Sequence, residues 1–257
     1  LSKKWILAIC LVSIAGNTPA TQPPKSGKAY VVSNAHMDTQ WLWTVQTSII
    51  DYIPRTIYQN LALIRDYPNY IFNFEGAIKY NWMKEYYPLD YEKVKEAIKN
   101  GRWHVSGSSW DANDVNVPSP ESSFRNILLG QEFYKKEFGL KSTDIFLPDC
   151  FGFGYTLPSI AKHCGLIGFS TQKLGWRKKP FYGDSKIPFT IGRWKGIDGA
   201  ELICALDCGS YVHNFKDDDL TRDNDLIQRV ERDPMRTAYR YFGAGDRGGS
   251  AMPVSAM

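Results

Sequence analysis

Histidine is scarce in this 257-residue sequence, which carries only His36, His104, His163 and His213. No two of them form a His-x-x-x-His pair, so a metal site that relies on such a pair is excluded.

Blocks of Lys or Arg are absent and the formal net charge is only +4, so a nucleic-acid partner is not expected. Cys204 and Cys208 have no second Cys/His pair at zinc-finger spacing, which favours buried free thiols. The apolar run from Trp5 to Ala15 is too short for a stable membrane span.

The first twenty residues differ in character from the rest of the chain. Lys3 and Lys4 precede the apolar run, and small and turn-forming residues follow it up to Ala20. This order is typical of a signal peptide over residues 1–20, so we expect export to the periplasm or the extracellular space. A buried N-terminal helix is the alternative. Residues 21–28 are polar and contain proline, which predicts a linker.

The four cysteines beyond the signal segment leave their redox state open. An exported protein can pair them, and four cysteines allow three pairings among which the sequence does not choose. They are Cys150, Cys164, Cys204 and Cys208.

Short apolar runs alternate with helical patterns along residues 29–206. Strands are predicted at 29–33, 70–74, 103–106, 144–147, 166–170, 189–194 and 201–206, and helices at 47–66, 77–87, 91–100, 120–138 and 156–163. Pro54 is compatible with the first of these helices only near its start or at a kink. The alternation predicts an α/β fold with a mainly parallel sheet.

In parallel sheets, functional residues gather just beyond the carboxyl ends of the strands. The polar residues that directly follow the predicted strands are therefore expected to form one site. They are rich in acid/base and metal-ligand chemistry: Asn34, His36, Asp38, Glu75, Ser106 to Asp114, Asp149, Gln172 and Lys173.

The segment His36-Met-Asp38 directly follows the first predicted strand. In extended backbone, residues i and i+2 point the same way, so the imidazole and the carboxylate can meet one cation. This ligand pair suits Zn²⁺, although an isolated His-x-Asp is also found as a surface pair. Trp41 lies three residues further on, where its indole could form the floor for a sugar ring.

A second feature is the segment from Leu147 to Tyr155, where a strand leads into a glycine-containing turn that displays Asp149. A carboxylate at this place suits a nucleophile, a base or a metal ligand. The alternative is an aspartate that caps the helix at 156–163 or stabilises the turn itself.

Together these segments resemble glycoside hydrolase family 38, the α-mannosidases. The resemblance rests on His-x-Asp-x-x-Trp after the first strand and on the Asp-x-Phe-Gly turn about a hundred residues later. It extends through Gly101-Arg-Trp103, Gly107 to Trp110, Asp114, Thr171 to Leu174 and Trp194 to Gly199, and reaches Gly245-Asp246-Arg-Gly-Gly249. It implies an irregular (β/α)7-type barrel with mainly parallel strands, over residues 29–250.

The resemblance also implies roles for individual residues. His36 and Asp38 would bind one zinc ion, and Asp149 would be both a ligand and the catalytic nucleophile. Asp246 falls where the general acid/base is expected, although a turn aspartate in a flexible loop is the plain alternative. The substrate would be a mannose-containing oligosaccharide or N-glycan, contacted by Trp41, Phe151, Lys173 and Asp114.

The sequence departs from the family in one respect. Family members have a fourth zinc ligand, a histidine further downstream, and none of the four histidines here lies in a matching segment. The resemblance thus implies a catalytic domain that is incomplete at its C-terminus, with residues 251–257 as an irregular tail. Two other functions stay open: a polysaccharide deacetylase-like enzyme, for which the histidine pair is lacking, and a carbohydrate-binding fragment without turnover.

Overall fold

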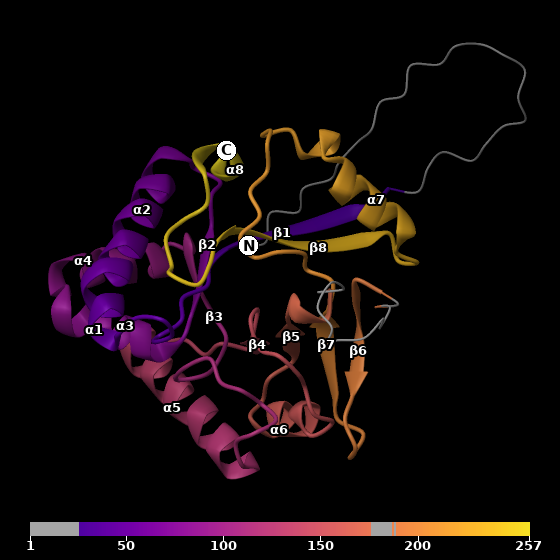
Figure 1. Ribbon diagram of the computed structural model, residues 1–257, viewed down its shortest axis with the longest axis horizontal. Coiled ribbons are helices and arrows are strands. Elements are labelled where there is room, and N and C mark those ends of the chain that lie inside the picture. Colours follow the sequence, from indigo (N-terminus) through magenta and orange to yellow (C-terminus); the bar gives the residue numbers. More distant parts are fainter. Residues whose placement is uncertain (1–25, 176–186, 188) are drawn as a thin grey trace, which may run out of the picture.

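The computed structural model describes residues 26–175, 187 and 189–257. Within these residues the strands form two four-stranded sheets, ordered β3-β2-β1-β8 and β4-β5-β7-β6 (Figure 1). The strands are β1 (Lys28–Ala35), β2 (Phe72–Glu75), β3 (Trp103–Ser106), β4 (Asp144–Phe146), β5 (Gly168–Ser170), β6 (Ile191–Lys195), β7 (Glu201–Ala205) and β8 (Thr237–Ala244).

Neighbouring strands run parallel in both sheets, except for β6 and β7, which are antiparallel. The predicted α/β class with mainly parallel strands is therefore confirmed. The two sheets approach each other at their edges: Gly107 N–H, just after β3, donates to Asp144 Oδ1 at 3.0 Å, and Tyr241 N–H of β8 donates to the Cys208 carbonyl at 2.8 Å. Among the described residues no strand ladder joins the sheets, so the closed barrel stays a prediction.

Helices cover the outside of both sheets (Figure 1). They are α1 (Val45–Thr47), α2 (Ile53–Asp66), α3 (Ala77–Tyr86), α4 (Pro88–Lys99), α5 (Pro120–Phe138), α6 (Leu157–His163), α7 (Asn224–Arg232) and α8 (Pro253–Ala256). Short 3₁₀ turns occur at Lys173–Gly175 and Leu220–Arg222. The largest apolar core lies between α2, α3, α4 and the first sheet, where Phe72, Phe74, Tyr80 and Trp103 pack edge to face.

The helix predicted over residues 47–66 is interrupted near its start. A π-helical turn (Ser48–Tyr52) separates α1 from α2, and Pro54 lies in the first turn of α2. The chain is helical on both sides of Pro54, and the Ile49 carbonyl of the π-turn accepts from the Tyr87 hydroxyl at 2.8 Å instead of from the helix alone. Pro54 thus lies at the start of α2 and directly after an irregular turn, the two placements that the sequence allowed.

The last part of the chain is more regular than the sequence suggested. β8 and α7 were not predicted, and the tail expected to be irregular at 251–257 contains α8, with Ala251 and Ala256 buried. The glycine-rich segment before α8 is fixed against α2: Asn60 Nδ2 donates to the Gly249 carbonyl at 2.7 Å, and Gly249 N–H donates to Thr56 Oγ1 at 2.9 Å. The glycine-rich segment is therefore held in place by tertiary hydrogen bonds to α2 and not by a local preference for helix or strand.

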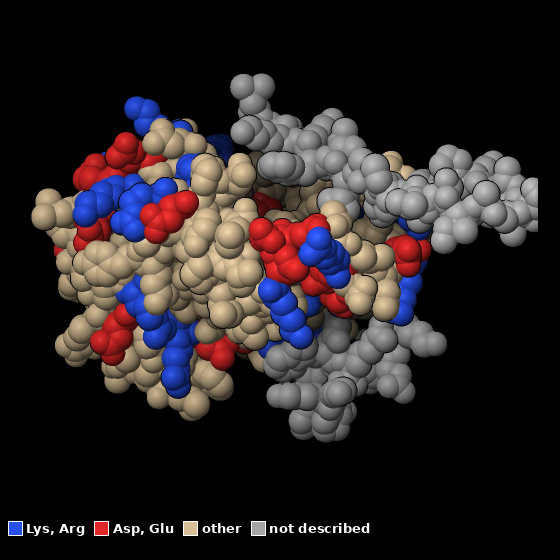
Figure 2. All heavy atoms as spheres, turned by 90° about the horizontal axis from the view of Figure 1, so that it is seen from above, with Lys and Arg blue, Asp and Glu red and all other residues tan. Residues whose placement is uncertain are grey.

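The four cysteines of the described chain, Cys150, Cys164, Cys204 and Cys208, are free thiols. None of the three possible disulfide pairings is therefore formed among them. Residues 1–20, expected to be a signal peptide, lie outside the described residues. No helix in the described part of the chain is long and apolar enough to cross a membrane. On the face drawn in Figure 2, charges of both signs are intermixed and form no broad basic patch.

Candidate metal centre and active site

His36 and Asp38 extend from the carboxyl end of β1 in the geometry that the sequence predicted. The backbone stays extended beyond the strand: His36 N–H donates to the Ala244 carbonyl at 3.2 Å, and Asp38 N–H to the Asp246 carbonyl at 2.9 Å. Met37 between them is buried, 1% exposed. The two flanking side chains therefore share a side, and His36 Nε2 lies 3.4 Å from Asp38 Oδ1.

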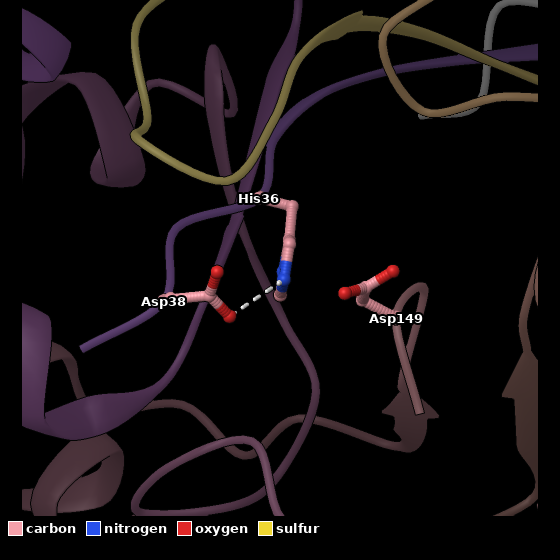
Figure 3. A group of neighbouring side chains, drawn as sticks. All are labelled: His36, Asp38 and Asp149. Carbon is pink, nitrogen blue, oxygen red and sulfur yellow. Dashed lines mark ion pairs between the residues drawn. The ribbon is translucent and has the colours of Figure 1, made fainter. Parts of the chain in front are cut away.

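Asp149 reaches the same place from the other sheet. It lies three residues beyond the end of β4, in the turn before α6. One ligand atom from each of His36, Asp38 and Asp149 lies within 4.8 Å of the other two. Figure 3 shows the two carboxylates on opposite sides of the imidazole. The cluster joins the two sheets at the carboxyl ends of their strands.

This donor set fits a zinc ion. His36 Nε2 is buried, and its 3.4 Å approach to Asp38 Oδ1 lacks hydrogen-bond geometry, so this nitrogen makes no hydrogen bond in the described structure. A buried ring nitrogen without a partner is unfavourable unless something else satisfies it, and a cation does so. One imidazole and two carboxylates are ligands that Zn²⁺ accepts, and three protein ligands leave a coordination position open. His104, His163 and His213 do not belong to the cluster.

The charge of His36 depends on its carboxylate neighbours. Burial alone would lower the pKa of His36, but Asp38 and Glu75 outweigh it and raise the pKa to about 9. Without a metal ion the ring is therefore protonated at pH 7 and forms ion pairs with both carboxylates.

Zinc binding is accordingly expected to release close to one proton per ion at pH 7. A metal ligand must be deprotonated, so the apparent affinity should rise about tenfold per pH unit below pH 9 and level off above it. Calorimetric titration in two buffers of different ionisation enthalpy measures the proton release. Affinity that does not change between pH 6.5 and 8.5 would contradict this assignment of the His36 charge.

Two further side chains hold the Asp149 carboxylate. Lys173 Nζ forms an ion pair with Asp149 Oδ1, and the Tyr211 hydroxyl lies 3.2 Å from the same oxygen. Lys173 is almost fully buried, and its ammonium lies 4.2 Å from the centre of the Phe151 ring. The two contacts fix the direction of the carboxylate and offset its charge.

Tyr211 connects Asp149 to Asp246. Its hydroxyl lies 2.6 Å from Asp246 Oδ1, and burial together with the two carboxylates raises the pKa of the phenol. Asp246 adopts a left-handed backbone conformation with φ of 60°, which aspartate tolerates better than most residues. The sequence pattern does not reveal Tyr211 because it lies six residues beyond the end of β7, and not directly after the strand.

A cavity of about 170 Å³ adjoins the cluster. Its walls include His36, Asp38 and Asp149, together with Asp114 and Phe151. Phe151 is 53% exposed, so an apolar ring surface is available beside the three clustered residues. Trp41 is not among the wall residues; it is 60% exposed and lies edge-on to Trp43, so its role in a sugar subsite stays a prediction.

Glu75, at the end of β2, lies behind His36. Its Oε1 atom is 3.0 Å from His36 Nδ1 and 2.8 Å from Lys79 Nζ. Burial alone would raise the pKa of Glu75, but Lys79 and His36 lower it to about 2, so the carboxylate stays ionised. The sequence placed Glu75 among the strand-end residues without giving it a role.

Fold and site together define a mainly parallel α/β protein with one histidine and two carboxylates clustered at its strand ends, where they could hold a metal ion. The model of the glycosyl hydrolases family 38 N-terminal domain matches residues 26–252. The chain belongs to this family.

Curated relatives agree with the family match. Alpha-mannosidase G of Dictyostelium discoideum is 36% identical over 68% of this chain and 16% of its own length. Alpha-mannosidase of Saccharomyces cerevisiae is 32% identical over 86% of this chain and 20% of its own length. The chain therefore spans about a fifth or less of the relatives that it matches.

Solved structures support the fold. An alpha-mannosidase from Enterococcus faecalis V583 matches with a TM-score of 0.69 and 20% identity, covering 87% of this chain and 25% of that one. A putative polysaccharide deacetylase from Mycobacterium smegmatis matches with a TM-score of 0.52 and 13% identity, over 90% of this chain and 81% of that one. The fold is thus shared between the two enzyme classes considered from the sequence, and the site residues must distinguish them.

Proposed function

We propose that the chain is the catalytic portion of a zinc-dependent retaining α-mannosidase that hydrolyses terminal α-mannosyl linkages in glycans. The family and the names of the curated relatives support the substrate class. The observation that carries the reaction type is the Tyr211 hydroxyl, which contacts both Asp149 and Asp246.

The spacing of the two carboxylates favours retention of the anomeric configuration. The Tyr211 hydroxyl oxygen lies 3.2 Å from Asp149 Oδ1 and 2.6 Å from Asp246 Oδ1. The distance between these two carboxylate oxygens therefore cannot exceed the sum of the two hydrogen-bond lengths. Retaining glycosidases hold their carboxyl groups roughly 5–5.5 Å apart, whereas inverting enzymes need roughly 6.5–9.5 Å to admit a water molecule. A bridge through a single oxygen atom suits the shorter spacing.

In this proposal Asp149 attacks the anomeric carbon and forms a glycosyl ester while the bond to the leaving oxygen breaks. Asp246 gives its proton to that oxygen. Asp246 then takes a proton from water as the water oxygen displaces Asp149, so mannose leaves with its original configuration. Lys173 and Tyr211 orient Asp149 for the attack.

His36, Asp38 and Asp149 would hold the zinc ion, which when bound supplies positive charge for binding sugar hydroxyls. The cavity is smaller than the roughly 300–1,000 Å³ of sites for drug-sized ligands, which suits one terminal sugar unit. Phe151 offers an apolar face to that unit, and Asp114 lies on the same wall.

The acid/base assignment is tested by Asp246→Ala. A leaving group that needs protonation should depart about 10²–10⁴ times more slowly in the variant, which is the usual contribution of general acid catalysis. For an activated leaving group such as 2,4-dinitrophenolate, which needs no protonation, the rate of the first step should fall far less. The measurement is kcat/KM across a series of aryl α-mannosides of rising leaving-group pKa.

The control for this series is Asp218→Ala, which removes an exposed aspartate. It should leave kcat/KM unchanged for every substrate. An equal loss for all leaving groups in Asp246→Ala would remove Asp246 from the acid/base role.

A further inference from the structure

We propose that Glu75 is a positioning residue for the metal ligand His36, and that Lys79 holds Glu75 in place. The carboxylate of Glu75 accepts a hydrogen bond from the N–H at His36 Nδ1, so that Nε2 is the nitrogen presented to Asp38 and Asp149. This inference rests on the proposed zinc site and adds to it the residues that orient its nitrogen ligand.

The position of Glu75 follows from the sheet. β2 and β1 are adjacent and parallel, with Asn34 level with Asn73, so His36 and Glu75, each two residues further along, lie side by side. Glu75 Oε1 is 3.0 Å from His36 Nδ1, and both side chains are almost fully buried. A carboxylate that accepts from one ring nitrogen is the common device for directing the other nitrogen to a metal ion.

Lys79 reaches the same oxygen from the first turn of α3. Gly76 makes the sharp turn from β2 into α3 with φ of 85°, a conformation that glycine adopts without strain. The turn brings Lys79 back over the strand end, where its Nζ lies 2.8 Å from Glu75 Oε1. Lys79 is fully buried, so its ammonium depends on this carboxylate.

A purely structural role explains this arrangement poorly. Well-packed apolar side chains often stabilise a core as well as a buried ion pair does. Here both cationic partners use Oε1, while Oε2 is buried and has no hydrogen-bond partner in the described structure. Since Lys79 balances the charge of Glu75, the pair adds a hydrogen-bond acceptor behind His36 without adding net charge to the site.

The test compares two double variants that both remove the buried lysine charge. Glu75→Leu/Lys79→Met deletes the hydrogen-bond acceptor behind His36. The zinc dissociation constant of this variant should rise about 10–100-fold, which is the usual effect of removing a group that hydrogen-bonds to a metal ligand. Glu75→Gln/Lys79→Met keeps an amide oxygen that can accept from Nδ1, and should recover most of that loss. Zinc affinity is measured on the full chain by competition with a chromophoric chelator.

The matched control is Glu137→Gln/Lys84→Met, which removes another Lys–Glu pair, 2.7 Å apart, on α5 and α3. It should leave zinc affinity unchanged. Equal affinity in wild type and in a folded Glu75→Leu/Lys79→Met variant would overturn the positioning role. If the zinc site itself were wrong, the result would differ. The zinc bound by the wild-type chain would then be unaffected by His36→Ala, or no zinc would bind at all.

A second measurement needs no variant. With only four histidines, the ¹⁵N-histidine spectrum of the chain can be assigned residue by residue. In zinc-loaded wild type, His36 should carry its proton on Nδ1 and bind the metal through Nε2. A proton on Nε2, or zinc bound to Nδ1, would overturn the proposal even if the variants fail to fold.

Discussion

Replacing Asp149 with asparagine is expected to lower kcat/KM for an aryl α-mannoside by at least about 10³-fold, which corresponds to about 4 kcal/mol of transition-state stabilisation. The amide keeps the shape of the side chain but is a poor nucleophile and a weaker metal ligand. The substitution removes the carboxylate proposed to receive the sugar and weakens one of the three candidate ligands of the cation.

Asp149→Gly with added azide separates these two effects. Azide can occupy the space of the missing carboxylate and attack an activated α-mannoside from the same face, giving a β-mannosyl azide. Zinc content is measured on the same sample. A variant that retains near-normal hydrolysis, or an azide product of α configuration, would contradict the nucleophile assignment.

Replacing His36 with alanine is expected to weaken zinc binding by more than about 100-fold, because even the loss of an outer partner of a ligand weakens binding roughly 10–100-fold. His36 is the only nitrogen ligand in the described cluster. Hydrolysis should fall in parallel, and excess zinc should restore little of it. Zinc is measured by competition with a chelator and by metal analysis after gel filtration.

His104→Ala is the matched control for this experiment, because His104 is exposed on β3 and lies outside the cluster. It should keep full zinc content. If instead His36→Ala retains zinc at wild-type affinity, the ion binds elsewhere and the metal centre at β1 is wrong.

That the three residues meet was predictable from the sequence because it depends on local geometry and one general rule, whereas their role as zinc ligands was implied by the family resemblance. His36 and Asp38 needed only extended backbone after a strand, which β1 provides. Asp149 needed only a strand that leads into a turn. Carboxyl ends of parallel strands converge, and this rule brought the two segments together before any side-chain contact was known.

β8 could not be recognised in the same way. Thr237, Tyr239, Tyr241 and Phe242 favour a strand, but Gly243 and two alanines do not, and β8 leads into a glycine-rich segment. Its order comes from pairing with β1 over eight residues. At Gly243 a side chain would collide with the Asn34 carbonyl, so the glycine serves the close approach of two strands. Such pairing is a tertiary effect that local propensity does not encode.

The contacts that orient the trio also lay beyond sequence reasoning. Tyr211 is 62 residues from Asp149 and 35 from Asp246, and it reaches both from an irregular segment after β7. The contact of Lys173 with substrate stays a prediction, and its ion pair with Asp149 was not foreseen. Glu75 and Lys79 are four residues apart in the sequence, but Glu75 ends β2 and Lys79 lies in α3, so their buried ion pair depends on the turn at Gly76 and not on helical spacing.

Zinc-edge X-ray absorption on the zinc-loaded chain tests the metal centre most directly. With His36, Asp38 and Asp149 as ligands, the first shell should contain only nitrogen and oxygen, at about 2.0–2.2 Å, with one imidazole. His36→Ala should lose the imidazole scattering. A sulfur shell at about 2.3 Å would place the ion at the cysteines and contradict the site at the strand ends.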